Sequence, residues 1–311
     1  MRHLANLKDY TGTEIHEILN RAKQIKAHPG HYQDSLKGES LAMLFQKTST
    51  RTRVSFEVAM TELGGHSIFI DWRSSNFVLT SIQYEIEYLS RNVSCIMARM
   101  LKNRDIKRIQ AASQAPIING CCEKYHPCQA LTDVFTMIEH TDKDLEDVHL
   151  VYTGVQNNVS NSLTLIASKL GFHFTLATPP TKPDSESYDP DIQEIILNSG
   201  RIKHVNDPAQ AIQSADFIYT DTWIDMQHFN DPARAEEKET LIKQMRPFQI
   251  NRDLVQDFNC KIMHDMPIHD HYEITPEMVS DPRSIIYLQA GNRLHAQKGL
   301  LHWLYFDTGA A

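Results

Sequence analysis

Three hydroxyl side chains and two arginines occupy five consecutive positions, residues 49–53, of this 311-residue sequence. They follow an apolar run, LAMLF, and open a helical pattern, so they stand where a strand gives way to a helix. Amides at a helix N-terminus lack partners within the helix, and the helix dipole there favours an anion. Ser49, Thr50 and Thr52 add hydroxyl donors, and the forked guanidinium of Arg51 matches phosphate oxygens. The segment therefore predicts an anion site.

Arg51 and Arg53 are expected to have different roles. Two positions on a helix correspond to about 200° of rotation, so both side chains cannot face one ligand. Glu57 follows Arg53 by four positions, which is the spacing of a helical ion pair. We therefore assign Arg51 to the anion and Arg53 to the helix. The alternative for the whole segment is a solvated helix, capped by Thr48 or Ser49, with a surface ion pair.

Composition narrows the class of ligand. The chain carries 39 acidic and 31 basic residues, a formal net charge of -8, without a lysine- or arginine-rich block. This balance argues against nucleic acid or an anionic membrane as the main partner, and no stretch approaches the ~20 apolar residues of a membrane span. The glycine motifs of dinucleotide and Walker-type sites are absent. We expect a cytoplasmic protein that binds a small molecule through its phosphate group.

The elements that must position these residues follow from hydrophobic periodicity. A capping box, Thr11 with Glu14, opens a first amphipathic helix. Short apolar runs then alternate with helical patterns, which predicts parallel strands joined by crossover helices. In such sheets the ligand lies at the carboxyl ends of the strands. The expected strands are 41–45, 66–70, 94–98, 115–119, 149–153, 172–178, 202–205, 216–220, 261–264 and 284–288.

A polar segment, HTDKDLED at 140–147, divides this alternation into two series. The expected fold is therefore α/β, with two doubly wound parallel-sheet domains. We place the first domain at residues 1–140 and the second at 147–288. A C-terminal helix, 289–311, is expected to return to the first domain.

Five short motifs punctuate the chain: STRTR at 49–53, HPCQ at 126–129, TDTW at 220–223, HDMP at 264–267 and GNRLHAQK at 291–298. In order and spacing they resemble the aspartate/ornithine carbamoyltransferase family. The resemblance implies that a carbamoyl group passes from carbamoyl phosphate to an ω-amino group, with ornithine as the default acceptor. It also implies a homotrimer and requires no metal, nucleotide or covalent nucleophile.

The family's reaction explains the residue types in the first half of the chain. A neutral amine attacks the carbonyl of carbamoyl phosphate, an oxyanion develops and phosphate leaves, so positive charge and hydrogen-bond donors are needed there. By resemblance, His126 polarises the carbonyl and Gln129 orients the carbamoyl amide; a core histidine is the alternative for His126. The implied catalytic residues are Arg51, Arg99, His126 and Arg293. The implied carbamoyl-phosphate ligands are Ser49, Thr50, Arg51, Thr52, Arg99, His126, Gln129 and Arg293.

The resemblance places the amine acceptor in the second half of the chain. Asn158 matches a residue that contacts the amino-acid end of ornithine, and Asp221 matches the carboxylate that holds its α-ammonium group. Two segments depart from the family pattern: residues 225–227 read Asp-Met-Gln instead of Ser-Met-Gly, and 264–267 read His-Asp-Met-Pro instead of His-Cys-Leu-Pro. The expected acceptor-binding residues are Asn158, Asp221, Asp225, Met226, Asp265 and Met266.

Because of the two added aspartates, Asp225 and Asp265, the sequence does not decide between possible acceptors. At ~5 Å and an effective dielectric of ~20, one carboxylate opposes the carboxylate of an amino acid by about 3 kcal/mol. A diamine such as putrescine, or a modified ornithine, is therefore an alternative acceptor. The loop 73–81, which in the family carries polar groups into a neighbouring subunit's site, here contains Val78 and Leu79. A non-catalytic paralogue that retains the phosphate site is the remaining alternative.

Two clusters of potential metal ligands are set aside. One is His264, His269 and His271 with Asp265 and Asp270, and the other is Cys121, Cys122, His126 and Cys128. Neither has the spacing of a zinc motif. We expect no metal and no cofactor, and five reduced cysteines.

Overall fold

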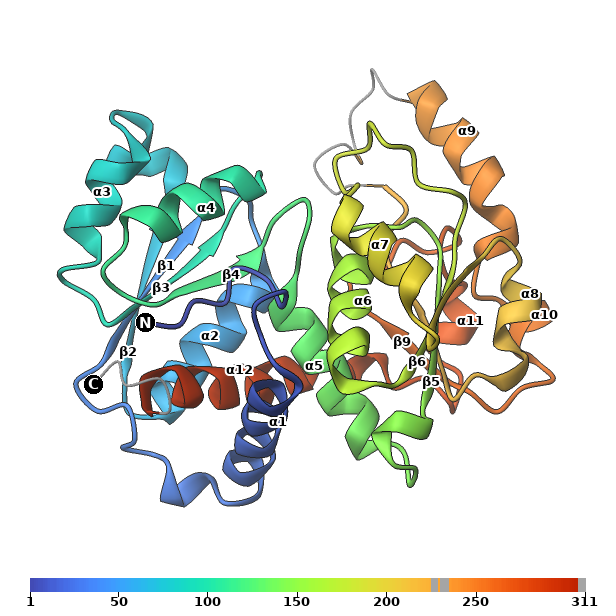
Figure 1. Ribbon diagram of the computed structural model, residues 1–311, viewed down its shortest axis with the longest axis horizontal. Coiled ribbons are helices and arrows are strands. Elements are labelled where there is room, and N and C mark those ends of the chain that lie inside the picture. Colours follow the sequence, from blue (N-terminus) through green and yellow to red (C-terminus); the bar gives the residue numbers. More distant parts are fainter. Residues whose placement is uncertain (225–228, 230–234, 307–311) are drawn as a thin grey trace. The chain divides into compact units, whose positions relative to one another are not determined.

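The computed structural model describes residues 1–224, 229 and 235–306. The chain forms two compact units, each built on one parallel β-sheet (Figure 1). Unit 1 comprises Met1–Thr136 and Gly291–Ala311, and unit 2 comprises Met137–Ala290. The predicted α/β class with two parallel sheets is confirmed. In the described part of the chain, no helix is both long enough and apolar enough to cross a membrane.

Unit 1 is built on four strands: β1 (Ser40–Phe45), β2 (His66–Asp71), β3 (Cys95–Arg99) and β4 (Ile117–Cys121). They form a parallel sheet in the order β2-β1-β3-β4. The helices are α1 (Gly12–Ala27), α2 (Thr50–Glu62), α3 (Ile82–Leu89), α4 (Asn103–Ala112), α5 (Pro127–Glu139) and α12 (Ile286–Phe306), with short 3-10 helices at Pro29–His31, Trp72–Ser74 and Asn76–Val78. Helices α3 and α4 lie on one side of the sheet, and α1, α2 and α12 lie on the other (Figure 1).

The local sequence explains these elements. Strands β1 and β3 are almost fully buried, because both faces of a parallel sheet are covered by helices. Edge strand β2 differs, since its Ile68 and Phe69 are exposed. At the start of α1 the predicted capping box forms: the Glu14 amide donates to Thr11 Oγ1 at 3.2 Å, and the Thr11 amide donates to Glu14 Oε2 at 2.8 Å.

Unit 2 is built on five strands: β5 (His149–Thr153), β6 (His173–Ala177), β7 (Ile202–Val205), β8 (Phe217–Thr220) and β9 (Lys261–His264). The sheet is parallel, in the order β7-β6-β5-β8-β9. The helices are α6 (Asn158–Leu170), α7 (Pro190–Asn198), α8 (Pro208–Ala211), α9 (Ala235–Met245), α10 (Arg252–Val255) and α11 (Pro276–Val279), with 3-10 helices at Leu145–Asp147, Ile212–Ser214 and Arg246–Phe248. Helices α6 and α7 lie together on one side of the sheet (Figure 1).

Each sheet has a point at which the strand order reverses. In unit 1 the chain leaves β1 for β2 on one side and later returns to β3 on the other. In unit 2 the reversal lies between β5 and β8. Ligands of open parallel sheets bind beyond the carboxyl ends of the strands at such a reversal. The loops after β1 and β3, and after β5 and β8, are therefore where sites are expected.

The strand predicted at 284–288 is wrong. Ser284 makes one isolated bridge to Ile262, and residues from Ile286 onward form α12. A short apolar run does not distinguish a buried strand from a buried helical turn, and here the run is the first turn of a 21-residue helix.

Gly299 lets α12 approach α1 closely. A Cβ at this position would lie 2.6 Å from both the Ile18 carbonyl oxygen and the Ala22 nitrogen, which are backbone atoms and cannot swing away. We expect Gly299→Ala to lower the free energy of unfolding by roughly 1–3 kcal/mol, the cost of overpacking. A Cβ at Gly291, on the same helix, would find open space, with no atom of another described segment within 4 Å. Gly291→Ala should raise that free energy by about 0.5–1 kcal/mol. Denaturant unfolding of both variants measures the contrast, and equal shifts would contradict it.

Candidate active site

Ser49 is the N-cap of α2, and it fixes the geometry of the loop after β1. Its backbone is extended, and its hydroxyl oxygen accepts a hydrogen bond from the Thr52 amide at 3.2 Å. Gln46 lies in the same loop. Its backbone amide donates to the Arg99 carbonyl, and its side-chain Oε1 accepts from the Leu101 amide, both at 2.9 Å. The ends of β1 and β3 are thereby tied together, which brings Arg99 to the start of α2.

Thr52 is the centre of a buried polar cluster. Its Oγ1 accepts from Arg293 Nη2 at 2.8 Å and from Arg99 Nη1 at 3.4 Å, and the Ser49 hydroxyl contacts it at 3.0 Å. Three of the predicted phosphate-binding segments, at α2, the end of β3 and α12, therefore meet in unit 1. The Nε of Arg99 is buried and makes no hydrogen bond to any described residue. The cluster thus holds a buried donor that an anion could use.

The two arginines of the STRTR motif separate as their spacing predicts. Arg53 is exposed, pairs with Glu57 at 2.9 Å and lies over the Phe69 ring with its guanidinium carbon 3.8 Å from the ring centroid. Arg51 is half-buried, and its charge acts on the ring of His126. The assignment of Arg53 to the helix is confirmed, and the assignment of Arg51 to the anion stays a prediction that its charge on His126 supports.

His126 is buried immediately before α5, whose first residue is a proline, a residue suited to that position. Burial lowers the pKa of His126 well below its ordinary value, and the positive charges of Arg293, Arg99, Lys47 and Arg51 lower it further. The ring is therefore neutral at pH 7. A neutral imidazole surrounded by cations can donate a hydrogen bond to a developing oxyanion without adding a titrating charge.

Gln129 is held by two neighbours in the same buried region. Its Oε1 accepts from Arg293 Nη1 at 2.5 Å, and its Nε2 donates to Asp133 Oδ1 at 2.8 Å. The side chain is thus already positioned by Arg293 and Asp133. Its role in orienting the carbamoyl amide stays a prediction.

Sequence reasoning missed Lys47 in unit 1. This residue lies within the segment FQKTSTRTR, two positions before the N-cap Ser49, and its charge acts on His126. Its place in the loop between β1 and α2 was the signal that could have identified it, since cations in that loop face the same anion site.

In unit 2, Asn157 and Asp221 join the loops after β5 and β8. Asn157 caps α6, since its Oδ1 accepts from the amides of Val159 and Ser160, and its Nδ2 donates to Asp221 Oδ2 at 2.7 Å. Both atoms of the Asn157 amide are therefore used for structure, and Asn158 is the half-buried first residue of the helix. The assignment of Asn158 to the ligand stays a prediction.

Gly154 allows these loops to pack. Its φ is +133°, and a Cβ would lie 3.2 Å from Trp223 Nε1 and 3.3 Å from Thr220 Oγ1. A side chain at this position would be strained and would push against the TDTW segment.

Asp221 and Asp265 are neighbours at the ends of β8 and β9. Thr220 is paired with His264 in the parallel register, and each aspartate is the first residue after its strand ends. Both are buried. Burial and the Asp265 carboxylate raise the pKa of Asp221 to about 7, against the lowering effects of His264 and the hydrogen bonds from Thr222 and Asn157. The pair therefore does not carry two full charges at neutral pH.

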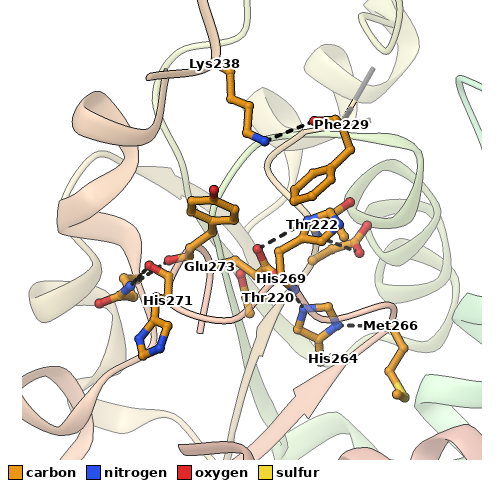
Figure 2. A network of polar contacts seen from close by, with 12 residues as sticks. Thr220, Thr222, Phe229, Lys238, His264, Met266, His269, His271 and Glu273 are labelled. Atoms are coloured by element: carbon orange, nitrogen blue, oxygen red, sulfur yellow. Dashed lines mark hydrogen bonds and ion pairs between the residues drawn. The ribbon is translucent and has the colours of Figure 1, made fainter. Parts of the chain in front are cut away.

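Glu273 is a second residue that sequence reasoning missed. Its carboxylate is fully buried and lies 3.2 Å from His264 Nε2, while the His269 amide donates to it at 2.6 Å (Figure 2). The other ring nitrogen of His264 accepts from the Met266 amide at 2.7 Å. Glu273 and His264 thereby fix the Asp265–Met266 turn, where Met266 has a positive φ of 65°. Glu273 lies nine positions after His264, so the fold, and no local sequence pattern, brings the two side chains together.

The histidine group around Glu273 also contacts α9. Figure 2 shows the Phe229 ring stacked on His269, at 3.9 Å between centroids, and the Lys238 ammonium donates to the Phe229 carbonyl at 3.0 Å. The predicted ligands Asp225 and Met226 lie outside the described residues. Within the described residues, no three His, Cys, Asp or Glu side chains are grouped so that they could hold a metal ion.

Models of known families match both units. The carbamoyl-P binding domain of aspartate/ornithine carbamoyltransferase matches residues 2–139, and the Asp/Orn binding domain matches residues 146–304. The anabolic ornithine carbamoyltransferase of Pyrococcus furiosus is 40% identical over 96% of this chain and 95% of its own length. The ornithine carbamoyltransferase of Archaeoglobus fulgidus is 38% identical over 97% and 96%.

Solved structures agree with these matches. The ornithine carbamoyltransferase from Pyrococcus furiosus superimposes with a TM-score of 0.86 and 38% identity, covering 96% of each chain. The anabolic ornithine carbamoyltransferase from Campylobacter jejuni gives a TM-score of 0.87 at 31% identity, covering 98% of this chain and 99% of that one. The matches therefore extend over both units and are not confined to the phosphate cluster.

Proposed function

The chain belongs to the aspartate/ornithine carbamoyltransferase family, and from that premise we propose that it transfers the carbamoyl group of carbamoyl phosphate to the ω-amino group of ornithine. The products are citrulline and phosphate. The observation that carries the proposal is the cluster in unit 1, in which Thr52 contacts Arg99 and Arg293 while four cations surround a neutral His126.

Catalysis in this proposal is electrostatic and positional. Ser49, Thr50 and Thr52 hold the phosphate together with Arg51, and Arg99 and Arg293 complete its charge neutralisation. His126 donates to the carbonyl oxygen as negative charge develops there, in a site where preorganised donors are worth more than in water. No residue of the cluster needs to form a covalent bond with the substrate. In this proposal the protein contributes orientation of the substrates and stabilisation of the developing charge.

Ornithine is the acceptor that the comparisons favour, and the diamine alternative is not favoured. Relatives that match this chain over nearly its whole length are named ornithine carbamoyltransferases. The electrostatic case for a diamine counted Asp225 and Asp265 as two added charges, and of these only Asp265 lies within the described residues. Since the pKa of Asp221 is raised to about 7, Asp221 and Asp265 oppose the substrate carboxylate less strongly than two full charges would.

We also propose that the protein assembles as a homotrimer through unit 1. Edge strand β2 and its neighbours expose the apolar side chains of Val54, Ile68, Phe69, Val78 and Leu79. Val54 and Phe69 line a pocket of about 300 Å³ that also contains Arg53 and Arg73. An exposed apolar patch beside an unpaired strand edge is typical of a surface that another copy covers. The mass in solution measures this assembly.

The proposed activity is tested by offering the purified protein carbamoyl phosphate with ornithine, acetylornithine, putrescine, lysine or aspartate. We expect citrulline and phosphate in equal amounts, with the highest kcat/KM for ornithine. A higher kcat/KM for putrescine would support the diamine alternative. Binding of carbamoyl phosphate without product from any of these amines would support a non-catalytic paralogue.

A further inference from the structure

Glu273 is a buried carboxyl group of unit 2 that the proposed reaction does not use directly. Its side chain is 0% exposed, and that of its neighbour His264 is 1% exposed. Removing a carboxyl group from water costs free energy unless hydrogen bonds compensate for the lost hydration. Glu273 Oε1 accepts from the His269 amide at 2.6 Å and lies 3.2 Å from His264 Nε2 (Figure 2). Its neighbours are therefore the place to look for its role.

The hydrogen bonds of His264 fix which of its ring nitrogens carries a proton. Nδ1 accepts from the Met266 amide at 2.7 Å, so this nitrogen presents a lone pair and carries no proton. The proton of a neutral imidazole then lies on Nε2, which donates it to Glu273 Oε1. The opposite tautomer, or an imidazolium, would place an N–H group against the Met266 amide. Glu273 thereby selects the form of His264 that can accept from Met266.

The Asp265–Met266 turn needs this support from its surroundings. Met266 has a φ of 65°, a conformation that residues with a long side chain rarely adopt and that persists only where neighbouring groups impose it. His264 contributes two such contacts. Its ring accepts from the Met266 amide, and its own amide donates to Gln289 Oε1 at 2.9 Å. The turn therefore depends on the His264 ring, and the ring depends on Glu273.

We propose that Glu273 is a positioning residue for the amine acceptor: through His264 it holds the turn that carries the predicted ligands Asp265 and Met266. Because it concerns the acceptor, this role rests on the proposed function. It requires no contact between Glu273 and a substrate. The predicted ligands of carbamoyl phosphate all belong to unit 1, so the role of Glu273 is confined to the second substrate.

Glu273 can serve as a fixed point because its own segment is tied to a neighbouring one. Gln249 Nε2 donates to the His271 carbonyl at 2.9 Å and to the Tyr272 carbonyl at 2.7 Å. The Ile250 amide donates to the Glu273 carbonyl at 2.9 Å. The carboxyl group therefore extends from a backbone that is anchored on both sides of the α-carbon.

The second carboxyl oxygen of Glu273 shows why glutamine is an informative replacement. Oε2 is buried, and within the part of the chain that the structure describes it makes no hydrogen bond. It lies 4.0 Å from His269 Nδ1. An amide nitrogen in its place would face that ring nitrogen, while the amide oxygen could still accept from His264 and from the His269 amide. Glu273→Gln thus keeps the contacts that position the turn, and Glu273→Ala removes them.

The test is the steady-state kinetics of both variants with both substrates. A small displacement of a binding group can cost about 10²-fold, so kcat/KM for ornithine should fall roughly 10–100-fold in Glu273→Ala. Most of this loss should be a rise in the KM for ornithine, because the turn acts in binding the acceptor. The KM for carbamoyl phosphate should stay at the wild-type value. Glu273→Gln should recover most of the lost affinity for ornithine.

Glu277→Ala is the matched control. Glu277 lies four residues after Glu273, but its side chain is exposed and pairs with Arg252 at the surface. Its replacement should leave both KM values unchanged, since exposed ion pairs contribute little. A general loss of stability would lower the fraction of folded enzyme and so the apparent kcat. It would not raise the KM for one substrate alone.

A double-mutant cycle tests whether Glu273 acts through His264. If it does, His264→Ala should raise the KM for ornithine about as much as Glu273→Ala does, and the double variant should be no worse than the more affected single variant. Additive losses would mean that Glu273 acts independently of the ring, and the inference would be wrong. The KM for ornithine in His264→Ala also carries the test if Glu273→Ala does not fold: a wild-type value there would contradict the inference.

The tautomer of His264 gives a readout that does not depend on activity. NMR of the ring nitrogens, in protein that carries isotope-labelled histidine, distinguishes a protonated from an unprotonated nitrogen. The His264 signals are those that are missing from His264→Ala. We expect the proton on Nε2 in wild type and in Glu273→Gln. A proton on Nδ1 in wild type would overturn the inference whatever the kinetics show.

The outcomes separate the role of Glu273 from the proposed function. Citrulline formation by wild type, with an unchanged KM for ornithine in Glu273→Ala, would overturn the role and leave the function standing. An equal rise in the KM for both substrates would do the same, because a positioning residue of the acceptor turn should affect only one. Absence of citrulline in wild type would overturn the function, and the role of Glu273 with it.

Discussion

Replacement of Arg51 by alanine is expected to lower kcat for citrulline formation by roughly 10²–10³-fold, the usual cost of losing one donor aimed at developing charge. Arg51 is the second residue of α2, where the helix dipole and the free amides already favour an anion. Its charge acts on His126, as do the charges of Arg99 and Arg293. Because phosphate gains negative charge as it leaves, the loss should fall on kcat as well as on the KM for carbamoyl phosphate.

Arg53→Ala is the control that makes this result specific. The two variants remove the same type of side chain from the same helix, two positions apart. Arg53 is exposed, and it pairs with Glu57 and lies over Phe69. Its replacement should change stability slightly and leave kcat close to that of wild type. The measurements are the kcat and Tm of both variants. Equal losses of kcat in the two variants, or an unchanged kcat in Arg51→Ala, would contradict the assignment of Arg51 to the phosphate.

The parallel α/β fold follows from the sequence because its cues are local. Buried strands of a parallel sheet are continuous apolar runs, and the helices between them show a period of 3.6 residues with recognisable caps such as Thr11 and Ser49. The strand prediction at 284–288 failed because the local cue there is ambiguous. That apolar run could form a strand or a helical turn, and the rest of the 21-residue helix α12, not the run itself, decides between them.

The phosphate half of the site was predictable because its residues lie within short motifs. STRTR and HPCQ place donors and cations at the start of α2 and α5, where the N-terminal geometry of a helix gives them a common use. The convergence of Arg99 and Arg293 on Thr52 could be inferred only by resemblance. Those residues are 47 and 241 positions away from Thr52, and no local pattern encodes such distances.

The acceptor half was less predictable because its properties depend on strand register. Sequence reasoning treated Asp265 as one more charge that opposes an amino acid. The pairing of Thr220 with His264 makes it instead the direct neighbour of Asp221, and this changes the protonation of the pair. Glu273 was missed for a similar reason, since only the fold brings a buried carboxylate to His264. A shift of one residue in the β8–β9 register would separate the two aspartates, so the TDTW and HDMP motifs, which place each of them at the acceptor, could not show that they are direct neighbours.

His126→Ala is expected to lower kcat by roughly 10²–10³-fold, because it removes a donor to the carbonyl oxygen of carbamoyl phosphate. A histidine in an active site usually adds its own titration to the pH profile, but His126 should add none between pH 6 and pH 8. Burial and four nearby cations hold the pKa of His126 well below its ordinary value, so the ring stays neutral as pH rises from 6 to 8. The pH profile of kcat/KM should therefore keep its wild-type shape when His126 is replaced by alanine.

Two further variants complete this experiment. His126→Asn keeps a neutral hydrogen-bond donor and should retain more activity than His126→Ala, which an effect of lost packing alone would not produce. His66→Ala removes an exposed imidazole from β2 and should leave both kcat and the pH profile at wild-type values. If an acid limb of the wild-type profile vanished in His126→Ala, His126 would be the titrating group, and the neutral-donor role would be wrong. If His126→Asn were no better than alanine, the ring would act through its shape and not through a donated hydrogen bond.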